Sequence, residues 1–189
     1  MAITYIVSSM ILILLSFIVF RVVVRKDYSD KGRLSPVSYI LEILIFALHA
    51  NFPYVFLSVD WPEMPPLPGN KIIVFSSVAT IVIGLIILLF AFLNLGYRPS
   101  LGMDKNELKI NGIYQYSRNP QLVGYGLVLF GFFILYLSWY SLGWFLIYLI
   151  ISYFMVKSEE EFLNMKYQEE YKEYCKIVPK VIRLFRYSI

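Results

Sequence analysis

The longest uncharged stretch of the chain covers residues 119–156 and contains 38 residues. As one α-helix it would be about 57 Å long, nearly twice the roughly 30 Å hydrocarbon core of a bilayer. The stretch therefore predicts two apolar helices joined by a turn, which we place at residues 138–141. Two further uncharged runs, 1–20 and 72–97, are each long enough to cross a bilayer once. The pattern predicts a polytopic membrane protein.

Composition excludes a water-soluble globule. Apolar residues make up 59% of the chain and charged residues 16%, whereas soluble domains carry about 25% charged residues. The single cysteine, Cys175, and the single histidine, His49, exclude a disulfide framework and a zinc site built from Cys and His clusters. We expect no metal. The net charge is +4. The charged residues lie almost entirely between the apolar runs, so their distribution indicates membrane topology rather than nucleic-acid binding.

The sequence predicts an all-α membrane protein of one domain, residues 1–189, with five transmembrane helices. We place them at about 3–24, 36–59, 72–95, 120–137 and 141–156, followed by a helical cytosolic tail, 157–189. Basic residues gather in 21–35, 96–119 and the tail, so the positive-inside rule predicts the N-terminus outside a plasma or inner membrane and the C-terminus in the cytosol. Trp139, Tyr140 and Trp144 fit an interfacial aromatic belt. Four prolines in 60–70 predict a non-helical external lid.

The tail has the pattern of an amphipathic helix. In residues 157–176 apolar and aromatic side chains recur at three- or four-residue intervals, at Leu163, Tyr167, Tyr171 and Tyr174. Pro179 should end or kink this helix. Its apolar face could pack under the bundle, lie on lipid head groups, or cover a site at the cytosolic mouth.

Polar residues gather just before the fourth predicted span and just after the fifth, which a tight hairpin would bring together. Asn119 before Pro120 has the form of a helix N-cap and a first-turn proline, beside Arg118. Such a corner can bind a carboxylate or phosphate. Opposite it, the carboxylates of residues 159–161 could hold an ammonium group or a ribose diol. Together the two segments suit a zwitterionic nucleoside ligand.

These motifs carry a family resemblance. Gly112-x-Tyr114-x-x-x-Arg118-Asn119-Pro120-x-x-x-Gly124, then Glu159-Glu160, then the tyrosine-rich tail ending in Val178-Pro179, resemble the integral-membrane methyltransferases typified by isoprenylcysteine carboxyl methyltransferase and the phospholipid methyltransferases. The resemblance covers about residues 106–182. It implies that S-adenosylmethionine binds at the cytosolic face, and that a membrane lipid or a prenylated small acceptor enters from the bilayer.

The resemblance also implies roles for particular residues. Arg118 and Glu160 would be catalytic. The cofactor-binding set would be Asn106, Gly112, Tyr114, Arg118, Asn119, Pro120, Gly124, Glu159, Glu160 and Tyr171. The activity would be most like isoprenylcysteine carboxyl O-methylation. The alternatives are phospholipid amine N-methylation, a non-catalytic membrane scaffold that keeps the fold, and an enzyme like the sterol reductases.

The chain departs from the family pattern at several positions. Many members have histidine where Asn106 and Asn119 stand, tyrosine where Leu122 stands, and glycine where Gln168 stands. Prenylcysteine enzymes carry an arginine where Ile177 stands, a natural partner for a substrate carboxylate. Lys176 or Lys180 could substitute for that arginine, although lysine lacks its bidentate fork.

Structural interpretations of the same residues stay open at this stage. Arg118 could be a membrane-interface anchor, Glu161 a solvated helix end, and Gly124 a small residue for close helix packing. Glu42 and His49 lie seven residues apart and share a helix face, where they could form structural hydrogen bonds or line an acceptor tunnel.

Overall fold

The computed structural model describes residues 2–57, 63–95, 108 and 110–182. Helix α1, Ala2–Phe17, continues through a π-helical segment, Ile18–Val24, into α2, Arg25–Lys31. Helix α3, Pro36–Asn51, ends in a 3-10 turn, Phe52–Val55, and α4 is Lys71–Leu95. After a second 3-10 turn, Gly112–Gln115, the chain forms α6, Pro120–Leu135, and α7, Trp139–Ile177. The described residues contain no β-strand.

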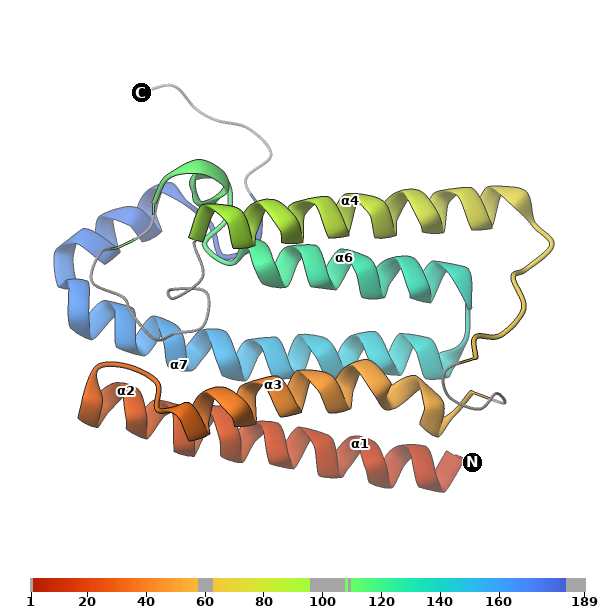
Figure 1. Ribbon diagram of the computed structural model, residues 1–189, viewed down its shortest axis with the longest axis horizontal. Coiled ribbons are helices and arrows are strands. Elements are labelled where there is room, and N and C mark those ends of the chain that lie inside the picture. Colours follow the sequence, from red (N-terminus) through yellow and green to blue (C-terminus); the bar gives the residue numbers. More distant parts are fainter. Residues whose placement is uncertain (1, 58–62, 96–107, 109, 183–189) are drawn as a thin grey trace.

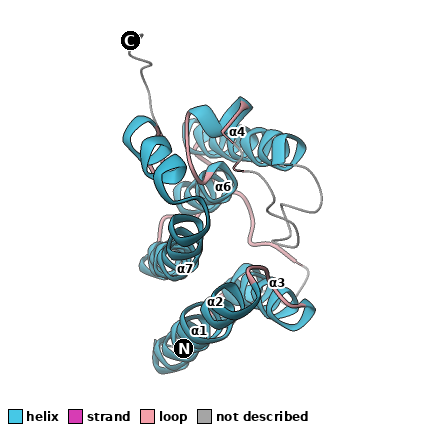
Figure 2. Cartoon of the chain, turned by 90° about the vertical axis from the view of Figure 1, so that its left-hand side faces the viewer, coloured by secondary structure: helices cyan, strands magenta, loops and turns pink. Residues whose placement is uncertain are grey.

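The long helices run alongside one another in a single bundle (Figure 1). An end-on view shows two groups: α4 packs on α6 in one, and α1 packs on α3 in the other (Figure 2). Helix α7 contacts both α1 and α6 and so joins the two groups. The end of the bundle that holds α2 also holds the second half of α7 and the Gly112–Gln115 turn.

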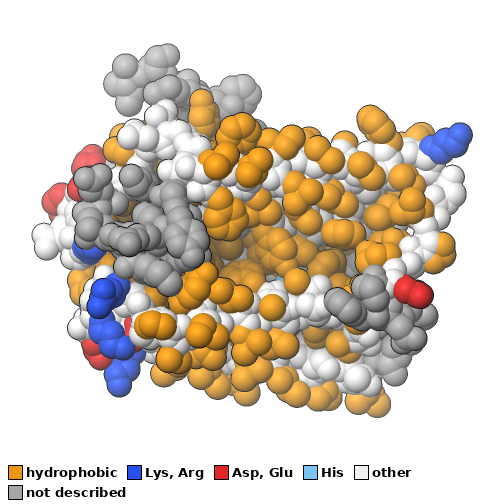
Figure 3. Space-filling model, viewed as in Figure 1, with side chains coloured by type: hydrophobic (Ala, Val, Ile, Leu, Met, Phe, Trp, Pro, Cys, Tyr) orange, Lys and Arg blue, Asp and Glu red, His pale blue; other side chains and the backbone are white. Residues whose placement is uncertain are grey.

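The chain is an integral membrane protein by the length and composition of its helices. Among the described residues, four helical segments are long and apolar enough to cross a bilayer: Ala2–Lys31, Pro36–Val55, Lys71–Asn94 and Trp139–Ile177. Helix α6 is equally apolar but has 16 residues, which gives a length of about 24 Å. Apolar side chains cover the middle of the bundle, and charged side chains lie toward its ends (Figure 3).

The predicted helices are all present, with shifted ends. The first extends seven residues beyond the predicted 3–24, to Lys31, and the second ends as an α-helix at Asn51, well before the predicted residue 59. A turn joins these two helices as predicted, but it lies at 136–138, slightly before the predicted 138–141. Ser138 caps α7 and forms a capping box with Ser141, so the helix begins at Trp139. Residues 63–70 are non-helical, as their prolines predict.

Two predictions were wrong, one about an aromatic residue and one about an acidic residue. Trp144 does not lie in an interfacial belt: it is buried in the bundle, and its Nε1 donates a hydrogen bond to the backbone oxygen of His49 at 2.8 Å. Glu161 is not a solvated helix end, because it forms ion pairs with Arg21 at 2.8 Å and Arg25 at 2.7 Å. These pairs fasten the charged half of α7 to the end of the first helix.

His49 is a structural residue of the bundle interior. Its imidazole is fully buried and stacks on Trp144. Nε2 lies 3.1 Å from the backbone oxygen of Trp144, and Nδ1 lies 3.3 Å from the hydroxyl of Tyr125. These contacts join α3 to α6 and α7, and they support the structural reading of His49 over a tunnel-lining one.

Helices α4 and α6 approach closely because glycines face each other at their crossing. A Cβ atom added to Gly84 would lie 2.6 Å from the backbone oxygen of Gly124, and one added to Gly124 would lie 2.8 Å from the backbone oxygen of Gly84. Any side chain larger than hydrogen would therefore push the two backbones apart.

Helix α7 continues past the membrane segment into the tail with one break, at Gln168. Gln168 has φ 44° and ψ −114°, a conformation that side-chain-bearing residues rarely adopt. The break turns the last part of α7 back toward the bundle (Figure 1). A glycine at this position would adopt the conformation without strain.

We expect Gln168→Gly to stabilise the protein by about 1 kcal/mol, because it removes the backbone strain at a positive φ. Thermal unfolding of the detergent-solubilised variant measures the change. Gln115→Gly serves as control, because Gln115 ends a 3-10 turn and its φ is not positive. An unchanged or lowered stability for Gln168→Gly would show that the break is not strained.

Candidate functional site

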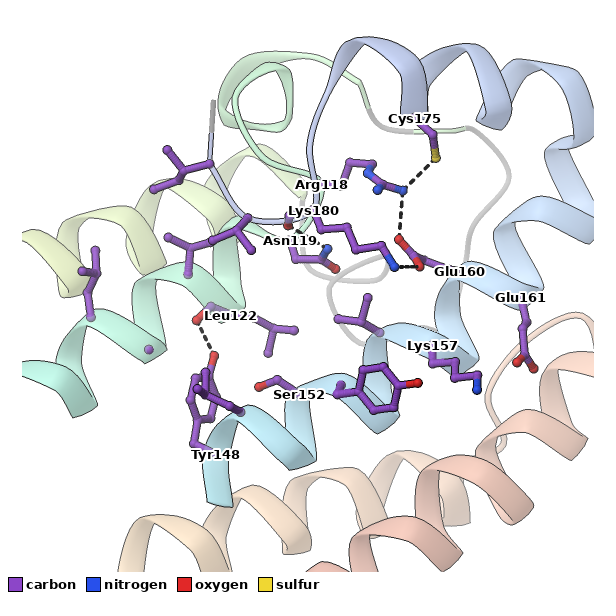
Figure 4. A pocket seen from close by; sticks show the side chains of 18 of the residues that line it. Arg118, Asn119, Leu122, Tyr148, Ser152, Lys157, Glu160, Glu161, Cys175 and Lys180 are labelled. Atoms are coloured by element: carbon purple, nitrogen blue, oxygen red, sulfur yellow. Dashed lines mark hydrogen bonds and ion pairs between the residues drawn. The ribbon is translucent and has the colours of Figure 1, made fainter. Parts of the chain in front are cut away.

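A cavity of about 960 Å³ lies between α6 and α7 and extends toward the charged end of the bundle. Its polar end contains charged and hydrogen-bonding side chains, and its deeper walls are apolar (Figure 4). The polar group comprises Arg118, Asn119, Lys157, Glu160, Glu161, Asn164, Tyr171, Cys175 and Lys180. The apolar group comprises Leu122, Val123, Leu127, Phe130, Phe145, Leu149, Val156, Val181 and Ile182.

Arg118 lies at the centre of the polar end. It stands two residues before α6, and its backbone N–H donates to the backbone oxygen of Pro179 at 3.1 Å. Its side chain is 10% exposed. Nη1 lies 2.9 Å from Glu160 Oε1 and 2.7 Å from Cys175 Sγ. The guanidinium is thus held in place on two sides by residues of α7.

Glu160 bridges two cations. One carboxylate oxygen pairs with Arg118, and the other lies 2.5 Å from Lys180 Nζ. The Glu160 side chain is 20% exposed and the Lys180 side chain 59% exposed, so the Lys180 contact is the more solvent-screened of the two. A carboxylate that lies between two cationic side chains can release one of them and bind a cationic group of a ligand in its place.

The segment after α7 returns across the start of α6. The backbone oxygen of Lys180 accepts hydrogen bonds from the Asn119 amide at 3.0 Å and from the Ser117 hydroxyl at 3.4 Å. Asn119 occupies the N-cap position of α6, with Pro120 next, as predicted. Its side chain does not cap the helix, because the amide is used for the Lys180 contact instead.

Tyrosines of the tail close the polar end from above. Tyr171 is buried, and its hydroxyl oxygen accepts a hydrogen bond from Arg118 Nη1 at 3.2 Å. Tyr174 is also buried and donates to the backbone oxygen of Tyr114 at 2.6 Å. Burial and the negative charge of Glu160 raise the pKa of the Tyr171 phenol above its ordinary value. Tyr171 therefore stays a neutral hydrogen-bonding group.

Of the predicted site residues, the structure brings four together around the cavity: Arg118, Asn119, Glu160 and Tyr171. The others among the described residues do not line it. Pro120 is buried at the start of α6, and Gly124 faces α4 rather than the cavity. Glu159 lies beside Glu160 on α7 but outside the lining. Asn106 falls outside the described residues.

Gly112 and Tyr114 support the corner from behind. Gly112 has φ 63°, and a Cβ atom there would lie 1.7 Å from Asn94 Oδ1. The position therefore requires glycine both for its backbone conformation and for its close approach to α4. Tyr114 is buried, and its backbone oxygen accepts the Tyr174 hydrogen bond. Both residues fix the loop that presents Arg118.

Sequence reasoning missed Cys175 and Lys157 as cavity residues and gave Lys180 only as a possible substitute for an arginine. Cys175 lies one turn after Tyr171, so its position on the tyrosine face of the tail was a usable signal. Lys157 lies three residues before Glu160 and shares its face of α7. Lys176, the other candidate for the missing arginine, pairs with Glu173 outside the cavity.

The arrangement suits an amphiphilic ligand or a pair of ligands that meet at the polar end. Arg118 Nε is buried and forms no hydrogen bond within the described part of the chain, which leaves one donor for an anionic group. Glu160 offers a carboxylate a few ångströms away, and the apolar walls extend from there into the membrane part of the bundle. A volume of this size holds a drug-sized molecule.

Comparison with known proteins gives one finding on the family. A family model described as "Phospholipid methyltransferase" matches residues 72–170. This range covers α4, α6 and most of α7, and so includes Arg118 and Glu160. No curated protein and no solved structure matches the chain.

Proposed function

The chain belongs to the phospholipid methyltransferase family, and from that premise we propose that it transfers a methyl group from S-adenosylmethionine to a lipophilic acceptor at the cytosolic membrane interface. The observation that carries this proposal is the single cavity that joins the Arg118–Glu160 pair to an apolar groove between α6 and α7. Such a cavity can hold a polar cofactor and a lipid acceptor side by side.

The residues at the polar end fit S-adenosylmethionine. Arg118, with its unpaired Nε, would hold the carboxylate of the amino acid part. Glu160, released from Lys180, would hold the ammonium group or the ribose hydroxyls. The buried Tyr171 would fix the Arg118 guanidinium from above. When bound, the cofactor supplies a methyl group on a positively charged sulfur.

The acceptor would reach this corner laterally from the bilayer. The groove walls are apolar over Leu122, Leu127, Phe130 and Leu149, so a lipid chain would exchange bilayer contacts for similar protein contacts at little cost. The tail tyrosines and the segment 178–182 cover the other approach and would exclude water from the reacting groups. Alignment and water exclusion would then supply most of the rate.

The first candidate acceptor is a carboxylate, as in isoprenylcysteine O-methylation. Lys180 supports this candidate, because it lines the cavity and contacts Glu160. It could replace the arginine that such enzymes carry at position 177, where Ile177 is 56% exposed and lies outside the cavity lining. A carboxylate is already ionised at neutral pH, so no base is needed.

The second candidate acceptor is a lipid amine. The family description and the carboxylates of Glu160 and Glu161 in the cavity favour it. An amine must lose a proton before or during transfer, and Glu160 would accept it as general base. Its present contact with Lys180 would have to open for this role.

The experiment that tests the function is radiolabelled methyl transfer from S-adenosylmethionine to a panel of prenylcysteine analogues, aminophospholipids, and soluble amines or acids. We expect turnover of at least one lipophilic class and none of the soluble compounds. Turnover restricted to soluble acceptors would refute lateral entry.

We also expect the polar end of the cavity to face the cytosol, because the basic clusters lie at that end. In a Cys175→Ser background, Lys172→Cys should be labelled by a membrane-impermeant maleimide only after the membrane is opened. Lys71→Cys, at the opposite end of α4, should be labelled in intact cells. The reverse labelling pattern would show that the polar end of the cavity faces away from the cytosol.

A further inference from the structure

Lys180 combines a fixed backbone with an exposed side chain at the polar end of the cavity. Its backbone oxygen accepts hydrogen bonds from Asn119 at 3.0 Å and from Ser117 at 3.4 Å. The preceding Pro179 oxygen accepts one from the Arg118 backbone N–H at 3.1 Å. These bonds hold the Lys180 backbone beside the start of α6. The ammonium group therefore stays within reach of the cavity, whichever partner it contacts.

The side chain of Lys180 has one acidic partner among the described residues, and that contact is easily exchanged. Its Nζ lies 2.5 Å from Glu160 Oε2, and Figure 4 shows the side chain extended toward this carboxylate. The Lys180 side chain is 59% exposed, so solvent screens the ion pair and the pair contributes little to stability. A cationic group of a ligand can therefore replace Lys180 at Glu160 at little cost.

No other carboxylate of the cavity is open to a displaced Lys180. Among the described residues that line the cavity, the acids are Glu160 and Glu161. Glu161 already pairs with Arg21 at 2.8 Å and with Arg25 at 2.7 Å. Once a ligand holds Glu160, the Lys180 ammonium has water or an anionic group of a second ligand as its partner.

The charge of the corner favours the anionic group. Arg118 and Lys180 are cations and Glu160 is an anion, so the three side chains together carry one net positive charge. S-adenosylmethionine has a cationic sulfur, an ammonium group and a carboxylate, and so adds a further net positive charge. Excess charge of one sign beside apolar walls is unfavourable, because a low dielectric weakens the screening of like charges. An anionic group on the acceptor reduces that excess.

We propose that Lys180 changes partners as the two ligands bind: S-adenosylmethionine displaces it from Glu160, and its ammonium group then binds an anionic group of the lipophilic acceptor. Lys180 in this way couples the two sites, so that each ligand strengthens the binding of the other. The inference rests on the proposed function for the identity of the cofactor. The anionic group is a carboxylate in a prenylcysteine and a phosphodiester in a phospholipid.

The test measures binding in detergent without turnover. The cofactor site is filled with sinefungin, an analogue of S-adenosylmethionine that has an amine in place of the methylsulfonium group and cannot transfer a methyl group. Two pairs of labelled lipids probe the acceptor site. One pair is N-acetyl-farnesylcysteine and its neutral methyl ester, and the other is phosphatidylethanolamine and diacylglycerol, which lacks the phosphodiester. Each lipid is titrated against the purified protein with and without sinefungin.

The variants change single lysines. Lys180→Gln removes the ammonium group, and Lys180→Arg keeps a cation. Lys172→Gln is the matched control, because it removes an exposed tail cation that pairs with Glu169 outside the cavity. Lys157→Gln removes the other lysine that lines the cavity, which contacts the ring of Tyr153 at 5.7 Å.

We expect sinefungin to strengthen binding of at least one anionic lipid about three- to tenfold and to leave binding of its neutral counterpart unchanged. The lipid pair that responds identifies the source of the anionic group. Lys180→Gln should abolish the strengthening, whereas Lys180→Arg and Lys172→Gln should keep it. Lys180→Gln should also bind sinefungin alone about two- to fivefold more tightly, because the internal competitor at Glu160 is gone.

Equal binding of both anionic lipids with and without sinefungin would overturn the proposal. So would a strengthening that survives in Lys180→Gln or that depends on Lys157 instead. Weaker sinefungin binding by Lys180→Gln would make Lys180 a support of the corner and not a competitor, and would also overturn it. Absence of sinefungin binding to the folded, unmodified protein would refute the proposed function and this inference with it. Coupling that depends on Lys180, without methyl transfer, would support the inference and refute the proposed activity.

Discussion

Replacing Arg118 with alanine is expected to weaken S-adenosylmethionine binding by about 1.5–3 kcal/mol, or roughly 10- to 150-fold. The reason is twofold. The substitution removes the buried cation that would pair with the cofactor carboxylate, and it leaves Glu160 with Lys180 as its remaining cationic partner. Methyl transfer at low cofactor concentration should fall at least in proportion.

Isothermal titration calorimetry with S-adenosylmethionine, on the detergent-solubilised variant and the unmodified protein, measures this loss of affinity. Lys176→Ala is the matched control, because it also removes one tail cation but from an exposed pair with Glu173 outside the cavity. It should leave the affinity unchanged. If the folded Arg118→Ala protein binds S-adenosylmethionine with normal affinity, Arg118 is a membrane-interface anchor, and the proposed cofactor site at Arg118 and Glu160 loses its basis.

Gly84→Ala and Gly124→Ala should each destabilise the protein by about 1–3 kcal/mol, the range for overpacking. Each new methyl group would fall within 3 Å of backbone atoms of the facing helix, and backbone cannot move aside as a side-chain tip can. The two substitutions act on the two sides of one contact, so their effects should be similar. Helix α6 would shift, and with it the Arg118 corner.

Thermal unfolding in detergent tests this prediction, with Gly69→Ala as control because a Cβ atom there meets nothing within 4 Å. Gly124 was predicted to contact the cofactor, whereas Gly84 was not. Loss of stability in both variants supports the packing role. Normal stability in Gly124→Ala with reduced cofactor affinity would instead return Gly124 to the cofactor site.

Sequence patterns were sufficient for the helices but not for their ends. The uncharged stretch 119–156 predicted a hairpin because its length exceeds any single crossing, and the Ser138 cap confirms the turn. The extension of the first helix to Lys31 could not be predicted, because its polar last turns make contacts with α7 such as the ion pair of Arg25 with Glu161. Only the fold brings these two residues together, since they lie far apart in the sequence.

The candidate site shows the same division. Arg118, Asn119 and Glu160 could be located from sequence because a tight hairpin necessarily brings the start of α6 near the charged part of α7. The face that each residue presents was not predictable, and for Gly124 the sequence left cofactor contact and close helix packing both open, whereas the structure has it facing α4. Lys180 and Cys175 reach the cavity only because α7 breaks at Gln168, a conformation that glutamine does not favour.

The non-catalytic and reductase-like alternatives differ from the proposed enzyme in what they bind. Equilibrium titration of the purified protein with S-adenosylmethionine, and separately with a nicotinamide dinucleotide, distinguishes all three most directly. We expect saturable binding of S-adenosylmethionine at micromolar to submillimolar concentration, and no binding of the dinucleotide. Absence of saturable S-adenosylmethionine binding by folded protein, or binding of the dinucleotide in its place, would contradict the account.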